Sequence, residues 1–162
     1  ENFPLEQKIV LECSSYMREV MTNVLVIHGA GMEKRGIDQI DVFGTMKLND
    51  YNDAINKFSS DLDISIEIFH SNDDAELISK ILNAESDFDG ILINPAGFTK
   101  GFPKLSDCIS KLKIPSLEIH VSNPAKRGRE SDIAPACYGV ITGAGVYGYY
   151  LGMMALKNIS ST

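Results

Sequence analysis

The 162-residue sequence is poor in cysteine and has neither a long apolar run nor an excess of positive charge. Its three cysteines, Cys13, Cys108 and Cys137, lack the spacing of a metal site, and their odd number indicates buried thiols in a reducing compartment. No apolar run reaches the roughly 18 residues that a membrane-spanning helix needs. The formal net charge of −7 disfavours nucleic acid, because binding to phosphates requires a basic surface. We therefore expect a cytoplasmic protein that binds neither nucleic acid nor a membrane.

The first 22 residues carry four glutamates among their apolar positions, a pattern that does not fit a signal peptide. Apolar residues recur at helical spacing from Leu5 to Met17, which predicts a helix over residues 5–21. Hydrophobic residues make up 44% of the chain, enough for a full core without disulfides or a metal ion. We expect an N-terminal helical extension over residues 1–22, one domain over residues 23–158, and a tail over residues 159–162.

Short apolar segments alternate with segments of helical periodicity along the rest of the chain. The predicted strands are residues 23–28, 64–70, 89–94, 115–120 and 138–143. The predicted helices are residues 48–62, 73–84, 102–112 and 145–158. This alternation indicates a parallel sheet with helices on both faces. Right-handed crossovers then give an α/β fold, a flavodoxin-like three-layer sandwich with five parallel strands in the order 2-1-3-4-5.

Polar residues end four of the predicted strands, namely His28, His70, Asn94 and His120. In open parallel sheets, ligands bind outside the carboxyl ends of the strands. We therefore expect Asn94 at the ligand, with Gly97 allowing close approach of the backbone. Because the three histidines lie on separate strands without a pattern of carboxylates, we expect no metal site.

The loop after the first predicted strand, HGAGMEKRG (28–36), is rich in glycine. It does not match the dinucleotide-binding fingerprint, because Lys34 occupies the place of the third glycine. Two interpretations remain for this region. It is either a mobile segment reaching Gly44 that closes over a substrate, or a solvated loop without function.

His120 ends a strand and is followed by a polar segment, so it is either a general acid or a structural histidine. The backbone N–H groups of Val121 and Ser122 could hold a carboxylate. The next loop, NPAKRGRESD (123–132), concentrates basic residues in an acidic protein. Arg127 in this loop could clamp an anionic ligand, or the loop could be an ordinary solvated one. We expect the tyrosines of the last predicted helix to serve in packing or in an interface rather than in catalysis.

Four stretches carry a resemblance to a known family: HSNDDAELI, GILINPAGFT, IPSLEIHVSNPAKR and GVITGAGVYGYYLGMMAL. In their order and spacing they resemble type II 3-dehydroquinases (3-dehydroquinate dehydratases), over residues 23–157. The resemblance implies a flavodoxin-like fold and a homo-oligomer of trimers packed into a dodecamer. It also implies removal of water from 3-dehydroquinate through an enolate, with no metal and no cofactor.

Several positions match residues to which the family gives a role. The resemblance implies Asn94 and the amides of Val121 and Ser122 for the substrate carboxylate, His120 as general acid, Arg127 in the following loop, and Asp107 reaching a neighbouring subunit's site. Ala96 and Gly97 leave room for the substrate ring.

Other positions depart from the family pattern. Gly31 replaces an asparagine that positions a water, and Lys100 replaces a substrate-contacting histidine. Phe43 replaces the tyrosine that abstracts the proton, and phenylalanine has no ionisable group. Asp38 occupies the position at which the family has an essential loop arginine, so the cation that would activate a tyrosine is missing as well. Another residue must therefore act as base if the chain is an enzyme.

The sequence predicts a diverged member that binds a small cyclic carboxylate and acts as a lyase or dehydratase with a different base. Asp38, Asp41 or Glu33 could be that base, and Lys100 could stabilise an enolate or a neighbouring anion. Gly31 and Phe43 would still border the substrate. Two alternatives remain open: a non-catalytic binding or assembly protein on the same scaffold, and an authentic 3-dehydroquinate dehydratase.

Overall fold

The computed structural model describes residues 22–159. The predicted N-terminal helix lies outside the described residues. The centre of the molecule is a five-stranded sheet in the order β2-β1-β3-β4-β5, in which all neighbouring strands are parallel. The strands are β1 (Thr22–Ala30), β2 (Ile64–His70), β3 (Gly90–Ala96), β4 (Ser116–His120) and β5 (Gly139–Thr142). The predicted fold class and strand order are therefore confirmed.

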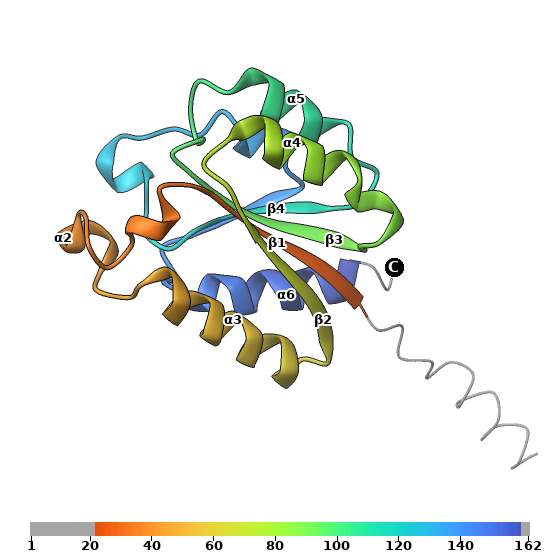
Figure 1. The fold of residues 1–162 in the computed structure, drawn as a ribbon, viewed down its shortest axis with the longest axis horizontal. Coiled ribbons are helices and arrows are strands. Elements are labelled where there is room, and N and C mark those ends of the chain that lie inside the picture. Colours follow the sequence, from red (N-terminus) through yellow and green to blue (C-terminus); the bar gives the residue numbers. More distant parts are fainter. Residues whose placement is uncertain (1–21, 160–162) are drawn as a thin grey trace, which may run out of the picture.

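Helices cover both faces of the sheet (Figure 1). The long helices are α3 (Leu48–Asp61) and α6 (Tyr147–Ile159) on one face, and α4 (Asp74–Leu82) and α5 (Pro103–Ser110) on the other. The shorter helical segments are η1 (Met32–Lys34), α2 (Ile40–Phe43), η2 (Ala84–Ser86), η3 (Ala125–Arg127) and η4 (Ala134–Ala136). In residues 22–159, no helix is both long and apolar enough to cross a membrane.

Alternation along β1 divides the core into two halves. Val24 and Val26 pack with residues of α3 and α6, whereas Leu25 and Ile27 pack with residues of α4 and α5. All four side chains are fully buried, as expected for a strand covered on both faces. The sequence therefore reads here as a continuous apolar run.

The strands β1 and β3 stay paired beyond their predicted carboxyl ends. Both strands run about two residues beyond their predicted ends, because pairing continues from His28 with Asn94 to Ala30 with Ala96. A side chain at Gly29 would place its Cβ 2.0 Å from the carbonyl oxygen of Pro95, so only glycine fits there. This close approach brings the segment after β1 against the segment after β3.

The segment between β1 and α3 is not a plain loop. It contains η1 and α2, and Gly31 and Gly44 both adopt positive φ, at 84° and 77°. Asn72, just after β2, accepts a hydrogen bond from the Gly31 N–H at 2.9 Å and donates one to Glu33 at 3.1 Å. These contacts tie the start of the segment to the end of β2.

Candidate functional site

A cavity of about 420 Å³ opens at the carboxyl ends of β3 and β4. From the β3 exit it is lined by Asn94, Ala96, Gly97 and Lys100. These are the four residues that the sequence assigned to this strand end. The cavity thus lies at the β3 exit, where the sequence predicts a ligand.

The β4 exit supplies the other wall of the same cavity. It contributes His120, Val121, Ser122 and Arg127, all of which are predicted site residues. Phe43 closes the cavity from the segment after β1. Nine predicted residues from three separate parts of the chain therefore meet in one place.

The remaining three predicted site residues lie elsewhere. Gly31 and Asp38 line a smaller cavity of about 310 Å³, which adjoins the first because Arg35 and Phe43 line both. Asp107 lies on α5, exposed and paired with Lys111 at 2.6 Å, and lines neither cavity. Its role toward a neighbouring subunit stays a prediction.

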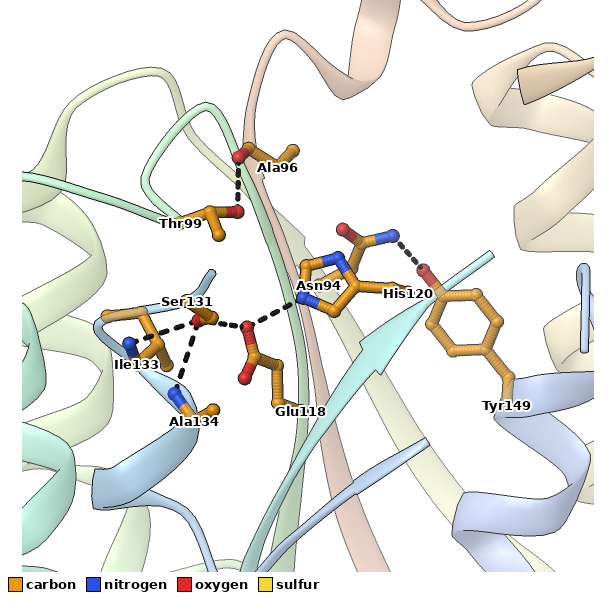
Figure 2. A network of polar contacts seen from close by, with 9 residues as sticks. All are labelled: Asn94, Ala96, Thr99, Glu118, His120, Ser131, Ile133, Ala134 and Tyr149. Carbon is orange, nitrogen blue, oxygen red and sulfur yellow. Dashed lines mark hydrogen bonds and ion pairs between the residues drawn. The ribbon is translucent and has the colours of Figure 1, made fainter. Parts of the chain in front are cut away.

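His120 is held by a buried carboxylate of its own strand (Figure 2). Its Nε2 lies 2.7 Å from Oε1 of Glu118, a side chain with no solvent exposure. The Ser131 hydroxyl donates to the same oxygen at 2.6 Å, and accepts from the N–H groups of Ile133 and Ala134 at 3.1 and 3.2 Å. With Nε2 engaged, Nδ1 is the ring nitrogen left for a ligand in the cavity.

Glu118 is a site residue that the sequence analysis missed. A signal was present, because a glutamate stands inside the apolar strand SLEIH, two residues before His120. Side chains two apart on a strand share a face, and a carboxylate is rarely buried without a partner.

Asn94 is anchored by a series of hydrogen-bonded side chains on the face of the sheet that α3 and α6 cover. Its Nδ2 donates to the Tyr149 hydroxyl at 3.2 Å, and this hydroxyl lies 3.3 Å from Nδ1 of His28 (Figure 2 shows the first contact). Nε2 of His28 lies 3.1 Å from Oδ1 of Asn52, on α3. A consistent set of donors follows: Asn94 donates to Tyr149, Tyr149 to His28, and His28 to Asn52.

Burial favours the neutral forms of the titratable side chains in this hydrogen-bonded series. Burial lowers the pKa of His28 from 6.5 to about 4, so the ring is neutral near pH 7. Burial raises the pKa of Tyr149 above its usual range, so the hydroxyl keeps its proton. The amide of Asn94 is therefore fixed with Nδ2 toward Tyr149. No motif in the sequence predicts this role of His28 and Tyr149.

The amides predicted to hold a carboxylate lie at the cavity wall. The loop after β4 is joined to the β5 side through its carbonyl oxygens, which accept from Gly143 and Gly145. The donors are Gly143 N to the carbonyls of His120 and Ser122, and Gly145 N to the carbonyl of Val121, at 3.0 to 3.1 Å. These bonds do not use the N–H groups of Val121 and Ser122.

Arg35 is a further site residue that the motifs in the sequence did not indicate. Its guanidinium carbon lies 3.4 Å from the centroid of the Phe43 ring, and that of Arg127 lies 5.6 Å from the same centroid. Partial burial lowers the pKa of Arg35. The inference that no cation accompanies position 43 is therefore wrong. Motif alignment puts Asp38 there, but the η1 turn brings the Arg35 side chain back over the ring.

The carboxylates considered as bases lie in different environments. Asp38 lines the adjoining cavity, whereas Asp41 is exposed and lines neither cavity. Glu33 lies 3.2 Å from His70 and accepts from Asn72, outside both cavities. Glu130, which the sequence analysis did not consider, lines the main cavity.

Comparison with known proteins identifies the family of this chain. The sequence model of the family described as Dehydroquinase class II matches residues 22–157, and the chain belongs to this family. It is 37% identical over 139 residues to a protein named 3-dehydroquinate dehydratase from a Nitratiruptor species, covering 84% of this chain and 89% of the relative. Identity reaches 39% over 142 residues with the protein of the same name from Caldanaerobacter subterraneus subsp. tengcongensis, covering 85% of this chain and 95% of the relative.

Solved structures show the same fold. The type II dehydroquinase from Butyrivibrio crossotus DSM 2876 superposes with a TM-score of 0.79 at 28% identity, covering 83% of this chain and 97% of that one. A 3-dehydroquinate dehydratase-like protein from Bifidobacterium longum gives a TM-score of 0.68 at 26% identity, covering 88% of this chain and 100% of that one.

Proposed function

We propose that this protein binds a small cyclic carboxylate in the main cavity and removes a hydroxyl group from it as water. In this proposal it is a carbon–oxygen lyase of the type II dehydroquinase family whose base differs from the family's tyrosine. The observation that carries the proposal is the position of His120. The ring is fixed by the buried Glu118 at 2.7 Å and lines the same cavity as Asn94 and Ser122.

The carboxylate of the ligand lies against the β3 and β4 exits. Asn94 donates one hydrogen to it through the amide hydrogen that Tyr149 does not take, and the N–H groups of Val121 and Ser122 donate to it as well. Hydrogen bonds to an ionised group are the strong ones, worth about 1.5–3 kcal/mol each. Binding of the carboxylate needs no cofactor, since these fixed N–H donors satisfy its negative charge.

Loss of water requires an acid for the leaving hydroxyl and a base for a proton on the neighbouring carbon. Asp38 takes the proton from a carbon next to a ring carbonyl group, and Lys100 stabilises the enolate that forms. His120 then gives the proton on Nδ1, the nitrogen that Glu118 does not contact, to the hydroxyl on the adjacent carbon, and the bond between carbon and oxygen breaks to release water. Glu130 is the competing base, because it lines the main cavity itself.

Turnover of a panel of cyclic hydroxycarboxylates, each with a ring carbonyl group positioned to form the enolate, tests the proposal. Ultraviolet absorbance follows the new double bond, and mass spectrometry follows the loss of one water. We expect His120→Gln to lower turnover by about two to four orders of magnitude, and His70→Gln to leave it unchanged. Comparison of Asp38→Asn with Glu130→Gln identifies the base. If compounds of the panel bind but none is turned over, the protein is a non-catalytic binding protein. If none of them binds, the proposal is refuted altogether.

A second candidate is the dehydration of 3-dehydroquinate itself. The curated relatives that cover most of this chain carry the name 3-dehydroquinate dehydratase, which favours this substrate. Phe43 argues against an ordinary mechanism, because a phenyl ring cannot accept a proton. Including 3-dehydroquinate in the panel separates the two candidates: turnover at ordinary enzymatic rates, about 1–1000 per second, would support this second one.

A further inference from the structure

Basic side chains are gathered at the two adjoining cavities far beyond their share in the protein. The cavities are lined by Lys34, Arg35, Lys100, Arg127 and Arg129, which are five of the chain's fifteen lysines and arginines. Among the acidic residues that the structure describes, only Asp38 and Glu130 line them, although the whole chain has twenty-two. A protein with a net charge of −7 thus presents a locally positive hollow.

Two of these cations face the same place without a counter-charge. Arg35 and Arg127 both approach the ring of Phe43, at 3.4 and 5.6 Å from its centroid. Arg35 makes a hydrogen bond to the sulfur of Met32, and Arg127 donates to the Ser122 hydroxyl and the Asn123 carbonyl. Within the described part of the chain, neither guanidinium forms an ion pair with a carboxylate.

This arrangement exceeds what one carboxylate needs. The proposed cradle of Asn94 and two backbone amides already satisfies a single carboxylate. The partly buried guanidinium of Arg35 and the exposed one of Arg127 repel each other, and an oxyanion between them would relieve that repulsion while accepting paired hydrogen bonds. The hydrogen bond of 3.0 Å from Arg127 to Ser122 puts this second position next to the cradle.

We infer that the ligand of this site carries, besides its first carboxylate, a second oxyanionic group, carboxylate or phosphate, that binds between Arg35 and Arg127. This inference rests on the proposed function, because it takes the first carboxylate to occupy the cradle. The cavity of about 420 Å³ has room for a six-membered ring with both substituents. The cations would then select against ring acids that carry only one charge.

Three aromatic probes of one shape test the inference: benzoate, isophthalate and meta-phosphobenzoate. Binding is measured by calorimetry or by ligand-detected NMR at fixed ionic strength. We expect one of the two probes with a second anionic group to bind about ten- to a hundredfold more tightly than benzoate, the gain of one charge-assisted hydrogen bond. The preferred probe identifies the second group as carboxylate or phosphate.

Variants then locate the second position. Arg35→Gln should abolish most of the preference for the probe with a second anionic group and leave benzoate affinity within about twofold. Lys104→Gln is the matched control, since it removes one positive charge from α5 outside both cavities, and it should preserve the preference. Equal binding of all three probes, or a preference that survives Arg35→Gln, would overturn the inference while leaving the proposed function standing. If none of the probes bound, both would fail.

Discussion

The buried ring of His28 should make the folded protein sensitive to mild acid. Its side chain has no solvent exposure, and both ring nitrogens are engaged, with Tyr149 and with Asn52. Burial lowers its pKa to about 4, against 6.5 in an exposed chain. Below pH 6.5 the unfolded chain therefore takes up a proton on this ring that the folded chain refuses. The stability that depends on neutral His28 is complete above pH 6.5 and is lost as the pH falls toward 4.

The size of the effect follows from the two pKa values. One pKa unit corresponds to about 1.4 kcal/mol, so the full shift amounts to about 3 kcal/mol. Between about pH 7.5 and pH 5, linkage predicts a loss of about 2 kcal/mol in the free energy of unfolding from this residue alone. That is a large share of the stability of an ordinary domain, about 5–15 kcal/mol.

Urea unfolding at a series of pH values measures this loss. The quantity to compare is the change in unfolding free energy with pH, since His28→Gln will also change stability at neutral pH by altering the contacts with Tyr149 and Asn52. The variant should lose about 2 kcal/mol less than the wild type over this interval. His70→Gln is the matched control, because the His70 side chain is a quarter exposed. If His28→Gln kept the full pH dependence of the wild type, the ring would be charged in the fold and the assigned direction of the buried chain of hydrogen bonds would be wrong.

Four further outcomes are expected. Asn94→Ala should weaken benzoate binding about ten- to a hundredfold by calorimetry, whereas unchanged affinity per folded molecule would mean that Asn94 serves Tyr149 alone. Phe43→Tyr should by itself raise the rate of dehydration of 3-dehydroquinate, because the Arg35 guanidinium, about 4–5 Å from the new phenolate, stabilises it by up to about 4 kcal/mol. If the rate did not rise, or if the rise persisted with Arg35→Gln, Arg35 would be excluded as the activator. Ser131→Ala should cost about 1.5–3 kcal/mol in urea unfolding, since Glu118 loses a charge-assisted hydrogen bond, while the exposed Ser110→Ala should cost little; equal costs would contradict the network. Light scattering should show a trimer-based assembly at micromolar concentration, and a monomer would refute the predicted homo-oligomer.

The sequence predicted the sheet well because strand signals are local. Apolar runs of strand length, alternating with amphipathic helices, allow few arrangements, and the carboxyl ends of parallel strands must share an edge. Asn94 and His120 could therefore be assigned to one site from their positions alone. Their supports could not, because the contact from Tyr149 to His28 joins residues 121 positions apart and depends on how α6 packs.

Arg35 shows a different limit of sequence reasoning. Alignment of motifs compares positions along the chain, so it placed Asp38 where the family has an arginine. Side chains reach a site through space, and the short turn at η1 turns Arg35 onto Phe43 instead. The positive charge that is absent at position 38 is thus supplied from position 35, three residues earlier in the chain.

The path of the chain also decides how the protein can be handled. β1 (from Thr22) starts at the amino edge of the sheet, and α6 (to Ile159) runs back from the carboxyl edge to end on that same side; Figure 1 shows the two ends of these elements near each other. Both points of departure from the fold thus lie opposite the cavity. A short linker attached at Thr22 or at Ile159 would hold the protein to a sensor surface by the side that faces away from the cavity. The mouth of the cavity would then face the flowing solution during ligand screening.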